Sequence, residues 1–91
     1  MATVTSIRLP LNHRINVGEY ESVEVMVDLE ATIDPGETVE HAYAQLREVS
    51  LKLWRQEAIL TLKGVIARRR DQGKDYSVPD VIVRHLAAQK G

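Results

Sequence analysis

Three histidines, His13, His41 and His85, are the side chains in this sequence best suited to hold a metal ion. Zinc sites draw ligands from short spacing motifs, and these histidines are far apart with no such motif around them. The chain has no cysteine, so neither a thiolate metal site nor a disulfide can form. We therefore expect no metal site and no cofactor.

Pairs of acids are the next candidates for chemistry, because two carboxyl groups can act as general acid and general base. Glu21 with Glu24, and Glu40 with Glu48, offer such pairs. Acids on strand and helix surfaces are far more often solvated. The sequence also has no Gly-Lys-Ser/Thr phosphate loop, no Gly-x-Ser-x-Gly elbow and no His-Glu-x-x-His pair. We expect no catalytic residue and a protein that is not an enzyme.

Basic and aromatic side chains suggest nucleic-acid binding, since cations bind phosphates and aromatic rings stack on bases. The candidate binding residues are Arg8, Arg14, Asn16, Tyr20, Arg68, Arg69 and Arg70. The first four lie on or beside one face of an expected hairpin, where Glu24, Asp28 and Glu30 would neutralise the arginines. The three consecutive arginines spread over about 200° of a helix. An alternative interpretation is that they complement the negative end of that helix.

Strict alternation is the strongest structural signal in the chain. Apolar residues occupy nearly every second position over residues 7–17 and again over residues 23–33, which predicts two strands. Residues 18–22 between them have the length and the glycine of a hairpin loop. The sequence therefore predicts an antiparallel β-hairpin over residues 7–33.

The predicted register pairs Val17 with Val23 and Ile15 with Val25. In this register both sets of apolar residues share one face, and arginines lie diagonal to acids on the other face. Pro10 has no amide donor, so we expect it at an edge position or at a bulge.

The segment Asp34-Pro35-Gly36-Glu37 has the features of a helix start, with Asp34 as the N-cap and Glu37 completing a capping box. Apolar residues then recur three and four positions apart and predict a long helix over residues 35–72, which Gly73 stops. Gly64 lies near a shift in the apolar phase. It marks a kink, a helix break or a close approach of another backbone.

A second capping box, Ser77-Val78-Pro79-Asp80, predicts a short C-terminal helix over residues 78–89. Its apolar side contains Val78, Val81, Ile82 and Leu86. We expect this helix to fold back on the long one.

The chain has 91 residues and 10.3 kDa, and we expect a single α+β domain over residues 1–91. A chain of this size hides only about 60–65% of the surface that its unfolded form exposes, so it needs further stabilisation. Because disulfides and metals are excluded, we expect a homodimer. The hairpins could join in one four-stranded sheet, or the long helices could pack together. Tyr43, Leu53 and Trp54 are the expected core or dimer-interface residues.

Charge is unevenly distributed along the chain, although the net charge is only −1. Residues 19–50 contain nine acids and a single base, whereas residues 51–91 contain nine bases and four acids. This layout is typical either of a bipolar surface or of a helix with an acidic start and a basic end. No apolar run approaches 18 residues and the first five residues lack the layout of a signal peptide, so we expect a cytoplasmic protein without membrane contact.

The segment Asn16-Val17-Gly18-Glu19-Tyr20-Glu21-Ser22, followed by an alternating strand, resembles a family of small uncharacterised phage and mobile-element proteins. Their recurring segment is Asn-Leu-Gly-Asn-Tyr-Glu-Ser, so this chain departs from it at Val17 and Glu19. The resemblance covers roughly residues 7–60. It implies a hairpin-plus-helix fold, a phage or replication context in the host cytoplasm, and roles for Asn16, Gly18, Tyr20 and Ser22. The same residues are also those of a well-formed turn.

These patterns predict a non-enzymatic protein that binds single-stranded nucleic acid with little sequence preference. The alternative is an inhibitor or accessory factor that presents the acidic stretch of residues 19–48 to a basic host protein. A third hypothesis is a purely structural assembly subunit.

Overall fold

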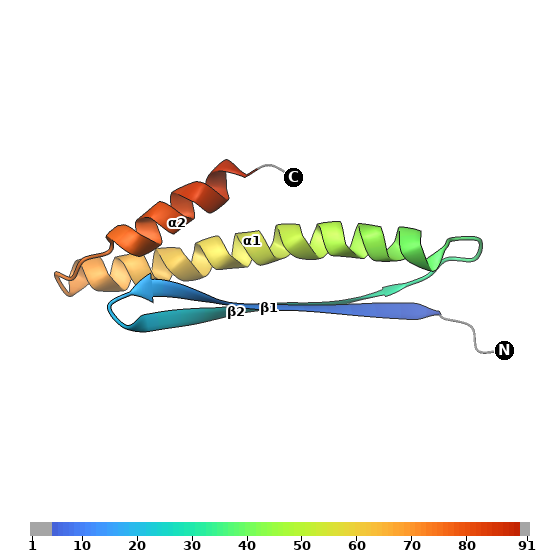
Figure 1. Cartoon of the computed structure of the whole chain (residues 1–91), viewed down its shortest axis with the longest axis horizontal. Helices are drawn as coiled ribbons and strands as arrows, with labels where there is room; N and C mark the ends of the chain where they lie inside the picture. Colours follow the sequence, from blue (N-terminus) through green and yellow to red (C-terminus); the bar gives the residue numbers. More distant parts are fainter. Residues whose placement is uncertain (1–4, 90–91) are drawn as a thin grey trace.

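A computed structural model describes residues 5–89. Strands β1 (Ser6–Gly18) and β2 (Glu21–Thr32) form an antiparallel hairpin, helix α1 (Val39–Asp71) lies along it, and helix α2 (Ser77–Ala88) folds back against α1 (Figure 1). The molecule is elongated, with extents of 60 × 23 × 15 Å. The predicted α+β class and the order of hairpin, long helix and short helix are confirmed.

The register of the hairpin differs from the predicted one by two residues. Ile15 lies opposite Val23 rather than Val25, and a bulge between Asn16 and Gly18 leaves Val17 without a partner of its own. Because the shift is an even number of residues, every apolar side chain keeps the face that the alternation predicts.

The turn itself is shorter than the predicted five-residue loop. Only Glu19 and Tyr20 separate the strands, and both have positive φ angles, 59° and 56°. Two consecutive residues with positive φ suit the right-handed twist of the flanking strands. Gly18, with φ of 79°, precedes them. The prediction missed this turn because Glu and Tyr rarely adopt the left-handed conformation.

Helix α1 begins at Val39, four residues later than predicted. Thr38 is the N-cap, and its Oγ1 accepts a hydrogen bond of 3.1 Å from the His41 amide. The segment of residues 34–37 is instead a turn, in which the Glu37 amide donates to the Asp34 carbonyl and Gly36 has a φ of 86°. Pro followed by a glycine with positive φ is typical of a type II turn.

The predicted end of α1 and the predicted start of α2 lie within one residue of those in the structure. Helix α1 runs without interruption through Gly64 to Asp71, and Gly73 follows with a φ of 68°, as the sequence predicts. Helix α2 begins at Ser77, but the predicted capping box is wrong. The Asp75 carboxylate accepts hydrogen bonds from the Ser77 amide (2.9 Å) and hydroxyl (3.1 Å), and these bonds lower the pKa of Asp75.

Buried residues recur every four positions along most of α1. They are Ala42, Leu46, Ser50, Ala58 and Leu62, with the half-buried Trp54 in the same series. Each four-residue step turns the buried side by about 40° around the helix axis. The contact therefore winds around α1 as the helix follows the twisted hairpin, which accounts for the shift in apolar phase near Gly64.

The main cluster of buried apolar residues lies at one end of the molecule. Val17, Leu62 and Val65 are buried there, and Ile15, Val23 and three residues of α2 pack against them. We call this half the turn end: residues 12–26 of the hairpin, residues 54–71 of α1, and α2. The open end comprises residues 6–11 of β1, 27–32 of β2 and 39–53 of α1.

Candidate interaction surfaces

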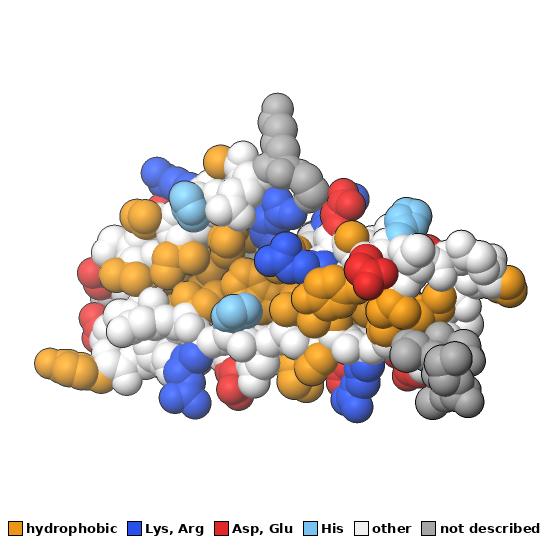
Figure 2. All heavy atoms as spheres, turned by 45° about the vertical axis from the view of Figure 1, so that its right-hand side comes forward, with side chains coloured by type: hydrophobic (Ala, Val, Ile, Leu, Met, Phe, Trp, Pro, Cys, Tyr) orange, Lys and Arg blue, Asp and Glu red, His pale blue; other side chains and the backbone are white. Residues whose placement is uncertain are grey.

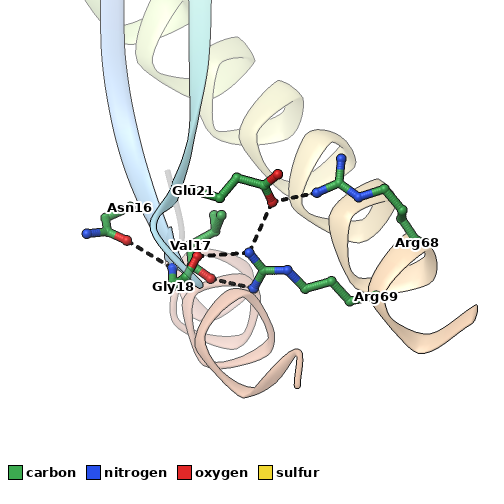
Figure 3. Close-up of polar contacts among 6 residues, drawn as sticks. All are labelled: Asn16, Val17, Gly18, Glu21, Arg68 and Arg69. Carbon is green, nitrogen blue, oxygen red and sulfur yellow. Dashed lines mark hydrogen bonds and ion pairs between the residues drawn. The ribbon is translucent and has the colours of Figure 1, made fainter. Parts of the chain in front are cut away.

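Arg69 is buried beneath the hairpin turn, with 3% of its surface exposed (Figure 3). Its Nη1 donates to the Val17 carbonyl at 2.6 Å, and its Nη2 donates to the Gly18 carbonyl and to Glu21 Oε1, both at 3.0 Å. The guanidinium thus satisfies backbone acceptors at the bulge. The sequence predicts Arg69 as a nucleic-acid-binding residue, but its guanidinium N–H groups point into the protein.

The two neighbouring arginines are also engaged by the protein. Arg68 donates to the same Glu21 oxygen at 2.5 Å, and the Arg70 guanidinium lies 5.4 Å from the centre of the Tyr76 ring. The hydrogen bond from Arg69, with the charges of both arginines, holds the pKa of Glu21 below its usual value. Arg68 and Arg69 therefore converge on Glu21, whereas Arg70 points to Tyr76, and each of the three has a partner.

The outer face of the hairpin carries charges of both signs, as the sequence predicts, and an acid of β2 pairs with Arg8. Arg8 forms a salt bridge with Asp28, including a 2.8 Å bond from its Nε to Oδ1, and this hydrogen bond lowers the pKa of Asp28. The predicted diagonal placement of Arg14 and Glu24 is wrong, because the register shift puts them directly opposite each other. The Glu24 carboxylate accepts a 3.2 Å hydrogen bond from the side-chain amide of Asn12. Such a face is a poor match for a polyanion.

Three of the predicted nucleic-acid residues, Arg14, Asn16 and Tyr20, gather beside the turn. Together with Glu21 and Ser22 they line a hollow of about 450 Å³. The Tyr20 side chain is fully exposed, and Asn16 Oδ1 accepts a 2.9 Å bond from the Gly18 amide. Arg8 lies far along the strand from this cluster, so the structure does not bring all seven candidates together.

A second hollow of about 290 Å³ lies between the turn and the end of α1. It is lined by Glu19, Glu21, Arg68, Arg69, Gln72 and Lys74. Glu21 borders both hollows, so carboxylates stand among the cations on each side of the turn. This arrangement opposes the binding of a phosphate backbone.

The open end has a groove that sequence reasoning missed. It has a volume of about 340 Å³ and runs between β2 and the first half of α1. Its apolar lining comprises Leu29, Ala31, Ala42, Leu46 and Val49, and its carboxylates are Glu30, Asp34 and Glu37. The signal in the sequence was the acidic stretch of residues 19–48. The apolar lining depends on how α1 crosses the hairpin, which alternation alone does not give.

The predicted dimer-interface residues have different positions. The Trp54 indole donates a 2.9 Å bond to the Val25 carbonyl, and its ring meets the His13 ring edge-on at 5.3 Å. Leu53 is half-buried, whereas 46% of the Tyr43 surface is exposed. Trp54 is therefore packed against its own hairpin, and Tyr43 is the most accessible of the three.

Within residues 5–89 no cluster of three or more His, Cys, Asp or Glu side chains could hold a metal ion. Neither helix in that range has the length and apolarity to cross a membrane. Comparison with known protein families, curated proteins and solved structures finds no match to this chain. The resemblance to phage proteins stays a prediction.

Proposed function

We propose that this chain is a non-enzymatic protein-binding module, and that its docking site is the acidic groove between β2 and α1. The observation that carries this proposal is the combination of five apolar lining residues with three carboxylates beside the outer edge of β2, which has no strand partner. It develops the hypothesis of an accessory factor that presents an acidic face to a basic protein.

The unpaired edge of β2 suggests how a partner would bind. A strand in a two-stranded sheet has backbone amides and carbonyls without strand partners on its outer side, and an extended peptide can pair with such an edge. Alternate side chains of that peptide would enter the apolar groove. Lysine or arginine at the positions between would meet Glu30 and Asp34, which favours a basic segment over an acidic one. Glu37 already accepts a hydrogen bond from the Asp34 backbone amide and lies beside His41.

Single-stranded nucleic acid is a second candidate ligand, favoured by one observation. Arg14, Asn16 and the fully exposed Tyr20 lie around one hollow, and this set combines a cation, an amide and an aromatic ring. The protein-binding proposal ranks above it because Arg8, Arg68, Arg69 and Arg70 all have partners within the protein.

Fluorescence anisotropy with two labelled peptides tests the protein-binding proposal. One peptide alternates valine with lysine over about ten residues, a length that matches a strand edge, and the other alternates valine with glutamate. We expect the lysine peptide to bind and the glutamate peptide not to bind. Glu30→Lys and Val49→Asp should each weaken binding at least about tenfold, a change of about 1.4 kcal/mol.

Glu19→Lys is the matched control, because it makes the same charge change at the exposed turn. It should leave the affinity for the lysine peptide unchanged within twofold, an estimate based on screening of distant surface charges. Equal binding of both peptides, or equal loss in Glu19→Lys and Glu30→Lys, would contradict a site in the groove.

A labelled single strand of about 30 nucleotides, measured at low and near-physiological salt against a duplex control, tests the second candidate. Tyr20→Ala should then abolish most of the binding, since stacking on one ring contributes about 1–3 kcal/mol per base. No binding at low salt would eliminate nucleic acid as a ligand.

A further inference from the structure

The isolated chain has far more surface than a compact protein of its mass. Its accessible surface is 6664 Å², whereas a compact 10.3 kDa protein exposes about 5,400 Å². Its radius of gyration is 17.2 Å, whereas about 12 Å is usual for this length. The excess of about 1,300 Å² is comparable with a whole protein–protein interface.

Part of this excess is an apolar band on the β1 side of the molecule. Figure 2 shows hydrophobic side chains running between the hairpin and α1, from beneath α2 towards the open end. The apolar residues of β1 at the open end, Ile7, Leu9 and Leu11, are only half-buried. Helix α1 contacts β2 more extensively than β1, and α2 approaches β1 near the turn, where Val78 lies beside Gly18.

Tyr43 belongs to the same side of α1. Trp54 faces β1, because its ring meets that of His13. Tyr43, Arg47, Ser50 and Trp54 follow one another at spacings of four, three and four residues, which places them on one stripe of the helix. Tyr43 and Trp54 are the aromatic members of this stripe. The exposed ring of Tyr43 therefore extends the band along α1 towards the open end.

We propose that a second copy of this chain covers the band, so that two open ends pack face to face about a two-fold axis. Two separate chains expose about 13,300 Å², whereas a compact protein of twice the mass exposes about 8,900 Å². The difference of about 4,400 Å² is the upper limit of the area that two such elongated chains could bury, and half of it already reaches the size of obligate homodimer interfaces. An isologous contact needs a surface that is self-complementary, and the apolar residues Ile7, Leu9, Leu11 and Tyr43 can meet the same residues of a second copy across a two-fold axis.

Face-to-face packing is favoured over the joining of two β1 edges into a four-stranded sheet. Pro10 has no amide to donate to a partner strand. In an antiparallel pairing centred on Leu11, Arg8 would lie opposite the partner subunit's Arg14, and like charges in opposed positions are destabilising. The band on the inner face of β1 has neither obstacle.

Analytical ultracentrifugation over a dilution series tests this dimer. We expect the native chain to sediment with twice the 10.3 kDa mass. Tyr43→Glu should weaken the dimer at least about tenfold, because it places a charge in an apolar contact. Leu60→Glu is the matched control, since Leu60 is also an apolar α1 residue, is 63% exposed, and lies outside the stripe.

The proposal would be overturned if the native chain were monomeric at every concentration. It would also be overturned if Tyr43→Glu weakened the dimer no more than Leu60→Glu does. Circular dichroism checks that both variants fold. If Tyr43→Glu does not fold, Leu9→Cys replaces it, because the chain has no other cysteine. A short bifunctional maleimide should then cross-link Leu9→Cys into dimers but not Met26→Cys, on the outer face. The opposite result would overturn the proposal.

This dimer does not rest on the proposed peptide groove, which lies along β2. The lysine peptide should therefore still bind the monomeric Tyr43→Glu chain, so failure of either proposal leaves the other testable.

Discussion

The two ends of this molecule are built from the same hairpin and the same helix, and both bury residues of α1, yet the cluster of buried residues that joins hairpin to helix lies at only one of them. At the turn end, Val17 and Leu62 are completely buried and α2 covers them. At the open end, the apolar residues of β1 and β2 are half-buried, and Ser50 is the one described residue with a buried polar side-chain atom that lacks a hydrogen-bond partner. The chain thus covers one end with its own last helix, and we infer that another chain covers the other.

The two ends also differ in how their charged side chains are paired. At the turn end Arg69 is buried, and it shares the Glu21 carboxylate with Arg68. At the open end the carboxylates of Glu30 and Asp34 border an apolar groove. Paired charges in a closed region stabilise the fold, whereas carboxylates beside apolar surface are available to select a partner.

The largest effect is expected from Leu62→Ala at the turn end. Its side chain is completely buried, so the substitution should lower the free energy of unfolding by about 4 kcal/mol. Leu9→Ala at the half-buried open end, made in the monomeric Tyr43→Glu chain, should cost only about 1 kcal/mol. Urea unfolding measures both. Similar losses at both sites would show that the ends are equally well packed.

Arg69→Met should cost about 3 kcal/mol, because it leaves the Val17 and Gly18 carbonyls without their charged donor. Arg70→Met is the matched control. It removes one exposed cation–π contact and should cost about 0.5–1 kcal/mol. An equal loss in the two variants would mean that Arg69 does not stabilise the turn.

Gly18→Ala tests how tightly α2 packs on the turn. A Cβ at Gly18 would lie 3.2 Å from Val78 Cγ2, in addition to the cost of a φ of 79°. We expect a loss of about 2 kcal/mol. Gly36→Ala has a similar φ of 86° but no atom within 4 Å of the added Cβ, so its loss should be about 1 kcal/mol. Thermal unfolding compares them, and a larger loss at Gly36 would argue against this packing.

The smallest effect is expected on the stability of the chain in acidic solution. Because Arg69 and Arg68 lower the pKa of Glu21 in the folded chain, ionised Glu21 stabilises the turn end. That contribution is complete above the pKa of the unfolded chain and is lost as the pH falls through the lower, folded pKa. Stability measured against pH should therefore fall less steeply in acid for Glu21→Gln than for the native chain. Parallel curves would contradict the role of this carboxylate.

Alternation and spacing predicted the elements of this fold and their faces, because those depend on local periodicity. The register depends on a bulge at Val17 and on positive φ angles at Glu19 and Tyr20. Neither the bulge nor these φ angles can be predicted from the residue types at those positions. The helix start was missed because Pro35-Gly36 suits a turn as well as a capping segment. The burial of Arg69 depends on two carbonyls that the bulge exposes, more than fifty positions away along the sequence.

Hydrogen–deuterium exchange at low and at high protein concentration tests most directly whether another chain completes the open end. Our account predicts that amides in residues 6–11 and 39–53 gain protection as the concentration rises, while those around Val17 and Leu62 stay equally protected throughout. Equal and concentration-independent protection of the two ends would contradict it.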